Sequence, residues 1–109
     1  MHDQGAVVSV NVTPSLIAAW FHRLFTHPVV EIDGQEQAAR WGITEKITVS
    51  PGEHCISVFF RYRRDHHARL AESAREFSTD TDVRRVDITA RLGPRNGSRF
   101  RIGTPSVHR

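Results

Sequence analysis

The sequence predicts an all-β protein, an antiparallel β-sandwich of about 7–8 short strands. Two observations support this prediction. Short segments alternate between apolar and polar residues, and turn-forming pairs such as Asp33-Gly34 and Pro51-Gly52 separate them. The chain is also long enough, at 109 residues of which 39% are hydrophobic, to enclose a core without disulfides or metals. Short strands at such close spacing are typical of Ig-like sandwiches.

The composition predicts one soluble domain over residues 1–109, with an ordered core at about 6–103. Cys55 is the only cysteine, so no internal disulfide can form and a reducing compartment is expected. The longest apolar run, residues 16–21, is far shorter than the roughly 20 residues of a membrane-spanning helix. No signal-peptide pattern is present either, and we therefore expect a cytoplasmic protein with no transmembrane segment.

The first expected element is a half-buried strand at residues 6–12, in which Ala6, Val8, Val10 and Val12 face one way and Val7, Ser9 and Asn11 the other. A short helix is expected within residues 14–26, with Thr13 as its N-cap and Pro14 at its first position. His27-Pro28 would end this helix. One apolar stripe would run along it, made of Leu16, Ile17, Trp20, Phe21 and Leu24.

Two strands are expected around Asp33-Gly34, because this pair supplies the positive φ angles of a tight hairpin turn. Residues 43–49 alternate as a further strand, although Glu45 interrupts its apolar side. The longest β-type run follows the Pro51-Gly52 turn and has the sequence HCISVFFRYR. Alternation assigns one of its faces to the core, with Ile56, Val58, Phe60 and Tyr62, and leaves Phe59, Arg61 and Arg63 on the other.

Residues 66–79 are ambiguous. Leu70, Ala74 and Phe77 have helical spacing, yet the segment lies between two strands and could return as the partner of the first. We expect a strand or an irregular hairpin arm, and a helix is the alternative. Residues 83–92 and 98–102 then alternate as two closing strands, joined by a loop that ends in Asn96-Gly97.

A resemblance to known proteins rests on turn and strand markers along about residues 28–102, namely VEIDGQ, ARWG, VSPGEHCISVFFRY, REFSTD and VDITARLGP. This pattern resembles a group of small, mostly uncharacterised actinobacterial proteins, and it is similar to PEGA-like modules. The resemblance implies a compact β-sandwich used for surface attachment or protein contact rather than catalysis. The apolar segment at 14–26 and the charged stretch RRDHHARLAESARE depart from the pattern, so no site residue is carried over.

Histidine and cysteine, which bind metals and perform catalysis, are present, but their spacing does not match a zinc site or a catalytic pair. His22 and His27 do not have the spacing of a two-ligand helical pair for zinc. His54 and Cys55 are neighbours in a strand, so their side chains diverge and cannot share a proton. We predict no catalytic, metal or cofactor site, and no enzyme activity.

Arginines are concentrated in the second half of the chain. Residues 54–109 hold twelve arginines and six acids, a net charge of +6, whereas residues 1–53 hold three basic residues and six acids, a net charge of −3. Such an asymmetry is typical of an anion-binding face, although a GC-rich genome produces the same bias. The candidate anion-binding residues are Arg61, Arg63, Arg91, Arg99 and Arg101, with Arg95 on the connecting loop and Phe59 as the one exposed ring.

The apolar segment is the other candidate surface. Trp20, Phe21 and Phe25 could bind a protein partner, cover an open end of the sandwich or lie at a membrane interface. We predict a non-enzymatic interaction module that mediates protein–protein contact or self-association, as a homodimer. The alternative is binding of an anion or a nucleic acid through the arginine-rich strands.

Overall fold

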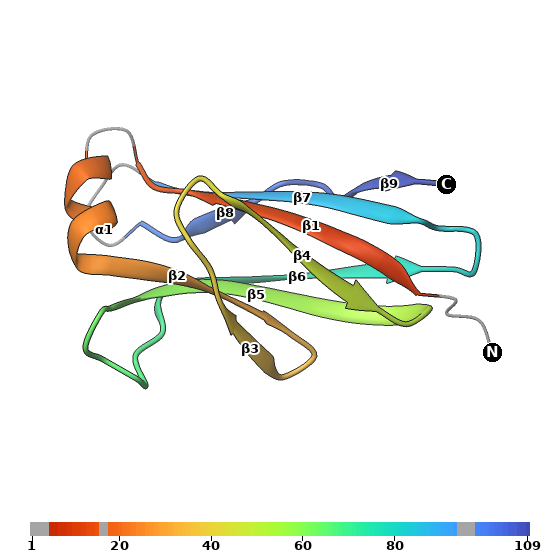
Figure 1. Ribbon diagram of the computed structural model, residues 1–109, viewed down its shortest axis with the longest axis horizontal. Coiled ribbons are helices and arrows are strands. Elements are labelled where there is room, and N and C mark those ends of the chain that lie inside the picture. Colours follow the sequence, from red (N-terminus) through yellow and green to blue (C-terminus); the bar gives the residue numbers. More distant parts are fainter. Residues whose placement is uncertain (1–4, 16–17, 94–97) are drawn as a thin grey trace.

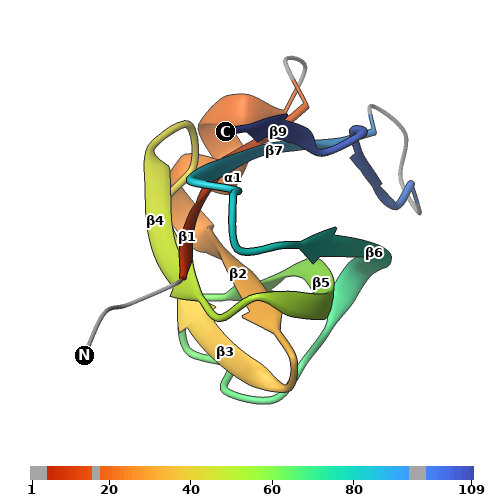
Figure 2. The same ribbon diagram turned by 90° about the vertical axis from the view of Figure 1, so that its right-hand side faces the viewer.

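Two β-sheets pack against each other in the computed structural model, which describes residues 5–15, 18–93 and 98–109 (Figures 1 and 2). One sheet has the order β4-β1-β7, with β8 and β9 both pairing with the far side of β7, and the other has the order β3-β2-β5-β6. The all-β sandwich prediction is confirmed. The elements are β1 (Ala6–Thr13), α1 (Ala19–Phe25), β2 (Thr26–Ile32), β3 (Gln35–Ala38), β4 (Thr44–Val49), β5 (Gly52–Tyr62), β6 (Leu70–Thr79), β7 (Arg85–Leu92), β8 (Phe100–Ile102) and β9 (Ser106–His108).

The core lies between the sheets and is built by alternation. The inward side chains of β1 and β7 are buried, and Val8, Val10 and Ile88 among them are at most 1% exposed. Ile56 and Val58 of β5 meet them from the other sheet and are fully buried. Burying a branched side chain of this size contributes about 1.5–3 kcal/mol, so these strands are held chiefly by their apolar faces.

β1 and β7 pair in parallel, with Val8 beside Val86 and Val10 beside Ile88. All other strand pairs among the described residues are antiparallel. The parallel pair places the first strand in the middle of its sheet, between β4 and a strand from the far end of the chain.

The β2–β3 hairpin turns at Asp33-Gly34 as predicted. Asp33 has a φ of 53° and Gly34 a φ of 88°, so both residues occupy the left-handed region that a two-residue hairpin turn requires. Residues 70–79 form β6, which pairs with β5, and this confirms the strand prediction over the helical alternative. At the other end of the chain, residues 106–108 form β9 on β7, beyond the expected ordered core.

The helix is shorter than the expected segment. It spans Ala19–Phe25, and its N-cap is Ala18, which makes no capping bond through its side chain. The prediction that Thr13 caps the helix is wrong, because Thr13 pairs with Arg91 as the last residue of β1. Leu16 and Ile17 lie outside the described residues.

Two turns of helix are too short to be stable alone, and α1 is anchored by His22. The buried imidazole of His22 lies 4.9 Å from the ring of Phe60 and 5.3 Å from that of Trp41. Its Nδ1 is 3.2 Å from Oγ1 of Thr26. These contacts fix the inner face of α1 and leave its outer face to solvent.

The molecule is elongated, with extents of 44 × 24 × 19 Å. α1 stands at one end, whereas β1 begins and β9 ends at the opposite end (Figure 1). Along one side, β6 is joined to β8 through Ser73, whose hydroxyl donates to the carbonyl of Phe100 at 2.6 Å. Arg75 likewise donates to the carbonyl of Ile102 at 3.1 Å. No helix in the described part of the chain has the length and apolar character needed to cross a bilayer.

Candidate functional site

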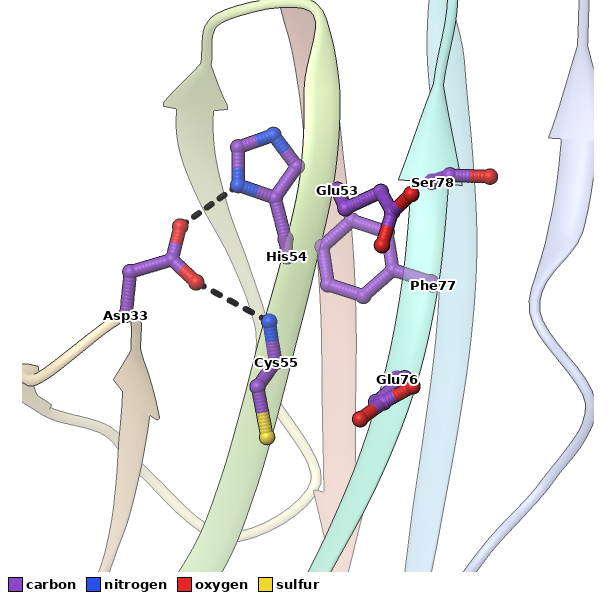
Figure 3. A pocket seen from close by; sticks show the side chains of 7 residues that line it. All are labelled: Asp33, Glu53, His54, Cys55, Glu76, Phe77 and Ser78. Carbon is purple, nitrogen blue, oxygen red and sulfur yellow. Dashed lines mark hydrogen bonds and ion pairs between the residues drawn. The ribbon is translucent and has the colours of Figure 1, made fainter.

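A surface hollow of about 400 Å³ lies over the ends of β5 and β6 (Figure 3). Its lining combines carboxylates, an imidazole and the one thiol of the chain, which are the groups that hydrolytic and redox sites use. Cys55 and Glu76 are register partners across β5 and β6. The residues that line the hollow are Asp33, Glu53, His54, Cys55, Glu76, Phe77 and Ser78.

His54 is held between two hydrogen-bond acceptors. Its Nδ1 lies 2.5 Å from a carboxylate oxygen of Asp33, and its Nε2 lies 2.7 Å from the carbonyl oxygen of Ser50. Because both partners only accept, the two contacts together favour the imidazolium form, in which each ring nitrogen donates. Burial acts to lower the pKa of His54, but the hydrogen bonds to Asp33 and to the Ser50 carbonyl outweigh it, and the pKa is raised above 6.5.

Asp33 joins this ion pair to the backbone of β5. Its second oxygen accepts from the N–H of Cys55 at 2.9 Å. The hydrogen bond from His54, followed by the one from the Cys55 amide, lowers the pKa of Asp33 below 3.8. The carboxylate is therefore ionised at neutral pH and holds the Asp33-Gly34 turn against β5.

Cys55 does not share this network through its side chain. The thiol is exposed and points away from the imidazole of His54 (Figure 3). Since both nitrogens of His54 are already bonded to acceptors, the ring has no free site to take a proton from the thiol. The arrangement is a structural ion pair. Among the residues that the structure describes, no group of three or more His, Cys, Asp or Glu side chains could hold a metal ion.

Arg61 is not available to an external anion. Its side chain is buried, and its guanidinium donates to Glu36 at 3.1 Å and to the carbonyl of Ala68 at 3.0 Å. Arg69 lies beside it and pairs with Glu31 and Glu72, each at 2.6 Å. The sequence pattern gave no sign of these contacts, because the partners come from other strands and from the loop before β6.

Phe59 was predicted to be an exposed ring on the arginine face, and this is wrong. It is fully buried on the outer side of its sheet. The guanidinium carbon of Arg69 lies 4.5 Å from its ring centroid, and that of Arg61 lies 5.1 Å away. These two cations cover the ring and remove it from the candidate stacking residues.

Arg63 bonds to the C-terminal end of α1. Its guanidinium donates to the carbonyls of Leu24 and Arg23, both at 2.9 Å, at the C-terminal end of α1. Arg63 therefore satisfies helix carbonyls that have no partner within the helix. The predicted stripe formed by Arg61 and Arg63 together with the arginines of the closing strands does not exist, because β5 lies in one sheet and β7 and β8 lie in the other.

The other predicted arginines, Arg91, Arg99 and Arg101, lie close together. Arg91 and Arg101 are register partners across β7 and β8, and both are exposed. Together with Arg99 they line a hollow of about 530 Å³. Arg95 lies outside the described residues.

Trp20, Phe21 and Phe25 also lie together, at the end of the molecule where α1 stands (Figure 1). Trp20 is 65% exposed and Phe25 is 49% exposed, whereas Phe21 is half-buried between them. The centroid of Phe21 lies 6.1 Å from that of Trp20 and 5.2 Å from that of Phe25.

Two further side chains extend this surface. Leu24 was predicted in the apolar stripe but not among the contact residues, and Tyr62 was not predicted on this surface at all. Leu24 lies one turn after Trp20 and is 61% exposed. Tyr62 was predicted to belong to the core, but it is 47% exposed and its ring centroid lies 6.2 Å from that of Phe21. We call these five side chains, Trp20, Phe21, Leu24, Phe25 and Tyr62, the apolar end patch.

Comparison of the chain with family models, with curated proteins and with solved structures gave no match in any of the three. The resemblance to PEGA-like modules therefore stays a prediction, and the argument for function rests on the surfaces described above.

Proposed function

We propose that this chain is a non-enzymatic interaction module that self-associates through the apolar end patch. The observation that supports this is the exposure of four large apolar side chains at one end of the molecule: Trp20, Leu24, Phe25 and Tyr62. The rings of Trp20, Phe25 and Tyr62 each lie next to that of Phe21. Large aromatic side chains left in water are costly, and such groups are enriched at protein interfaces.

The size of the patch suits the centre of an interface. An aromatic side chain covers about 150–250 Å², so three half-exposed rings and Leu24 give roughly 400 Å², a size at which apolar patches are often functional. A standard interface buries about 800 Å² on each partner, so the apolar end patch would supply the centre and its polar surroundings the rim.

A second copy of the chain is the occupant that the helix suits best. Trp20 and Leu24 lie one turn apart on the outer face of α1. If two copies meet about a two-fold axis with their helices antiparallel, Trp20 of each copy packs on Leu24 of the other. The same small surface then provides both halves of the contact, as a two-fold interface requires.

The ionisable side chains of the hollow over β5 and β6 are also consistent with a binding role rather than a catalytic one. His54 and Asp33 are bonded to each other and to the backbone, so neither is poised for proton transfer. We expect the module to act in a reducing cytoplasm, where the exposed thiol of Cys55 stays free.

Light scattering coupled to size exclusion, over a range of protein concentrations, tests the proposal. We expect the native protein to form a dimer and Trp20→Ala to weaken its association about 30-fold, the loss of roughly 2 kcal/mol that marks a hot-spot residue. Val107→Ala is the matched control, because Val107 is 43% exposed on β9, at the far end of the molecule.

A native protein that stays monomeric up to about 1 mM would contradict self-association. So would an equal loss of association in Trp20→Ala and Val107→Ala. Since the side chain of Trp20 is largely in solvent, the substitution should leave the thermal unfolding temperature within a few degrees of the native value.

A further inference from the structure

Two arginines face each other across the short β7–β8 pair. Arg91 of β7 lies directly opposite Arg101 of β8, and both point outward because their neighbours Leu92 and Phe100 are buried. Side chains opposite each other in an antiparallel pair are about 5 Å apart at Cβ, and like charges at this distance repel. The pairing costs stability unless an anion lies nearby.

Most other arginines of the described residues are already bonded. Carboxylates pair with Arg40, Arg61, Arg69, Arg85 and Arg109, and backbone carbonyls accept from Arg63 and Arg75. Arg91, Arg99 and Arg101 make no ion pair or side-chain hydrogen bond within the part of the chain that the structure describes. Three unpaired guanidinium groups therefore line one hollow, and none of the other described residues that line it carries a carboxylate.

A second hollow adjoins the first at two shared residues. It has a volume of about 640 Å³ and shares Ser98 and Arg99 with the arginine hollow. Its wall is mixed, and the apolar part is formed by Phe60, Tyr62, Leu70 and Ala71. Arg69 and Glu72 also line it, but they are bonded to each other at 2.6 Å. The two hollows together offer an apolar site beside a cluster of three cations.

We propose that these joined hollows bind an acidic segment of a partner protein, with its carboxylates on Arg91, Arg99 and Arg101 and an apolar side chain beside Tyr62. Guanidinium groups bind carboxylates through paired hydrogen bonds, which fixes the orientation of the segment as well as its charge. This binding does not require self-association, since Trp20 and Leu24 line neither hollow. Tyr62 is the one residue that the second hollow shares with the apolar end patch.

A nucleic acid suits this surface less well. A phosphate backbone that followed both hollows would meet the carboxylate of Glu72 in the second one. Binding of single strands also needs several stacking rings along a basic track, whereas Phe59 is buried and Arg61 and Arg63 have internal partners.

A titration followed by amide chemical shifts of the ¹⁵N-labelled protein tests the proposal. The probe is acetyl-Leu-Glu-Glu-Glu-amide, and acetyl-Leu-Gln-Gln-Gln-amide is its uncharged counterpart. We expect the acidic peptide alone to shift the amides of residues that line the two hollows. Arg91→Gln and Arg101→Gln should each weaken binding about tenfold, as expected for losing one charged hydrogen-bond partner.

Arg84→Gln is the matched control, since Arg84 is an exposed arginine before β7 with no side-chain partner among the described residues. Equal binding of the two peptides, or an equal loss in Arg84→Gln, would overturn the proposal. Tighter binding of a short oligothymidylate than of the acidic peptide would overturn it in favour of nucleic acid.

A charge reversal separates binding from folding. Arg101→Glu puts a carboxylate opposite Arg91, so the unfolding temperature should stay the same or rise, because a repulsive cross-strand pair becomes attractive. The same variant should no longer bind the acidic peptide. A variant that is stable and still binds with native affinity would contradict the assignment.

Discussion

Single side chains connect segments that are distant in the sequence, and His54 is the clearest case. Its imidazolium joins the carboxylate of Asp33, in the β2–β3 turn, to the carbonyl of Ser50, before β5. The hydroxyl of Thr79, at the end of β6, donates to the same carbonyl at 3.2 Å. One buried ring thus fastens two turns and a strand end to each other.

This ion pair predicts a pH dependence of stability. The pKa of His54 is raised by folding, so its contribution is complete below about 6.5 and is lost as the pH rises through the higher folded value. The pKa of Asp33 is lowered, so its contribution is present above about 3.8 and is lost as the pH falls through the lower folded value. The pair therefore stabilises the fold most between these two limits.

Asp33→Asn should lower the free energy of unfolding by about 1–2 kcal/mol near pH 6, the range of a charged hydrogen bond discounted for the half-exposed carboxylate. The difference from the native protein should shrink as the pH rises through the raised pKa of His54, because the ring then loses its positive charge. Urea unfolding of the two proteins at a series of pH values measures this difference.

Comparing variant with native protein is essential, because burial lowers the pKa of His22 and of His27. These two rings contribute stability that is lost as the pH falls, which is the opposite slope, and they do so in both proteins. A constant difference between native protein and Asp33→Asn across the whole range would show that the ion pair is not its source.

At the scale of elements, α1 depends on bonds from outside itself. The hydroxyl of Thr26 donates to the carbonyl of His22 at 2.9 Å, and the backbone N–H of Arg63 donates to that of Phe25 at 3.0 Å. The guanidinium of Arg63 takes two more carbonyls of the last turn. The end of β5 therefore stabilises the short helix that presents the apolar end patch.

Arg63→Ala should loosen α1 without touching an apolar side chain of the patch. Loss of the two charged hydrogen bonds to helix carbonyls should speed amide hydrogen exchange in α1 about tenfold or more. Exchange followed by mass spectrometry or by nuclear magnetic resonance measures the effect, and self-association should weaken in parallel.

Arg64→Ala is the control for this change, because Arg64 is exposed and its side chain makes no bond within the described residues. It should leave exchange in α1 at the native rate. Unchanged exchange in Arg63→Ala as well would mean that the guanidinium does not stabilise the helix.

The strands could be predicted from the sequence because alternation in β1, β5 and β7 reports directly which side chains are buried. Strand direction could not, since Val8 and Val10 alternate in the same way beside a parallel or an antiparallel neighbour. The segment at Leu70–Thr79 has an edge strand's weak pattern, and only its pairing with β5 decides between strand and helix.

The candidate surfaces were predictable only where the residues are close in sequence. Trp20, Phe21 and Phe25 share a surface because they share a helix. The burial of Phe59 depends on Arg69, which reaches it from the loop before β6, and no local pattern encodes that contact. Tyr62 continues the inward face of β5, but alternation does not reveal that the sheet ends there.

At the scale of the whole molecule, the two long sides of the sandwich differ. On one side, Ser73 and Arg75 of β6 donate to carbonyls of β8 and join the sheets. On the other side, β3 and β4 are separated by a hollow of about 320 Å³ lined by Ile32, Ile47 and Val49 among others. The sandwich is closed along the β6–β8 side and open along the β3–β4 side.

The hydrogen bonds along the closed β6–β8 side should contribute measurably to the free energy of unfolding. The double variant Ser73→Ala/Arg75→Met leaves the carbonyls of Phe100 and Ile102 without their donors, so the free energy of unfolding should fall by about 2 kcal/mol. Amide exchange should increase most in β8, which is only three residues long. Chemical unfolding and residue-resolved exchange measure the two effects.

The control is a second double variant that makes the same two substitutions, Ser→Ala and Arg→Met, at positions without side-chain bonds in the described part of the chain. Ser78 is exposed on β6 and Arg84 is exposed before β7, and neither side chain bonds to another described residue. Ser78→Ala/Arg84→Met should change the free energy of unfolding by no more than about 0.5 kcal/mol. Equal losses in the two double variants would show that the β6–β8 bonds add nothing specific.

The placement of the chain ends determines how the fold would respond to mechanical force. β1 begins and β9 ends at the same end of the molecule, and both strands pair with β7 (Figure 1). Tension between Ala6 and His108 would pull across these strands rather than along them. It would peel them from β7 one hydrogen-bonded pair after another, whereas a shearing load must break all pairs together. The sandwich should therefore open at low force despite its tightly packed core.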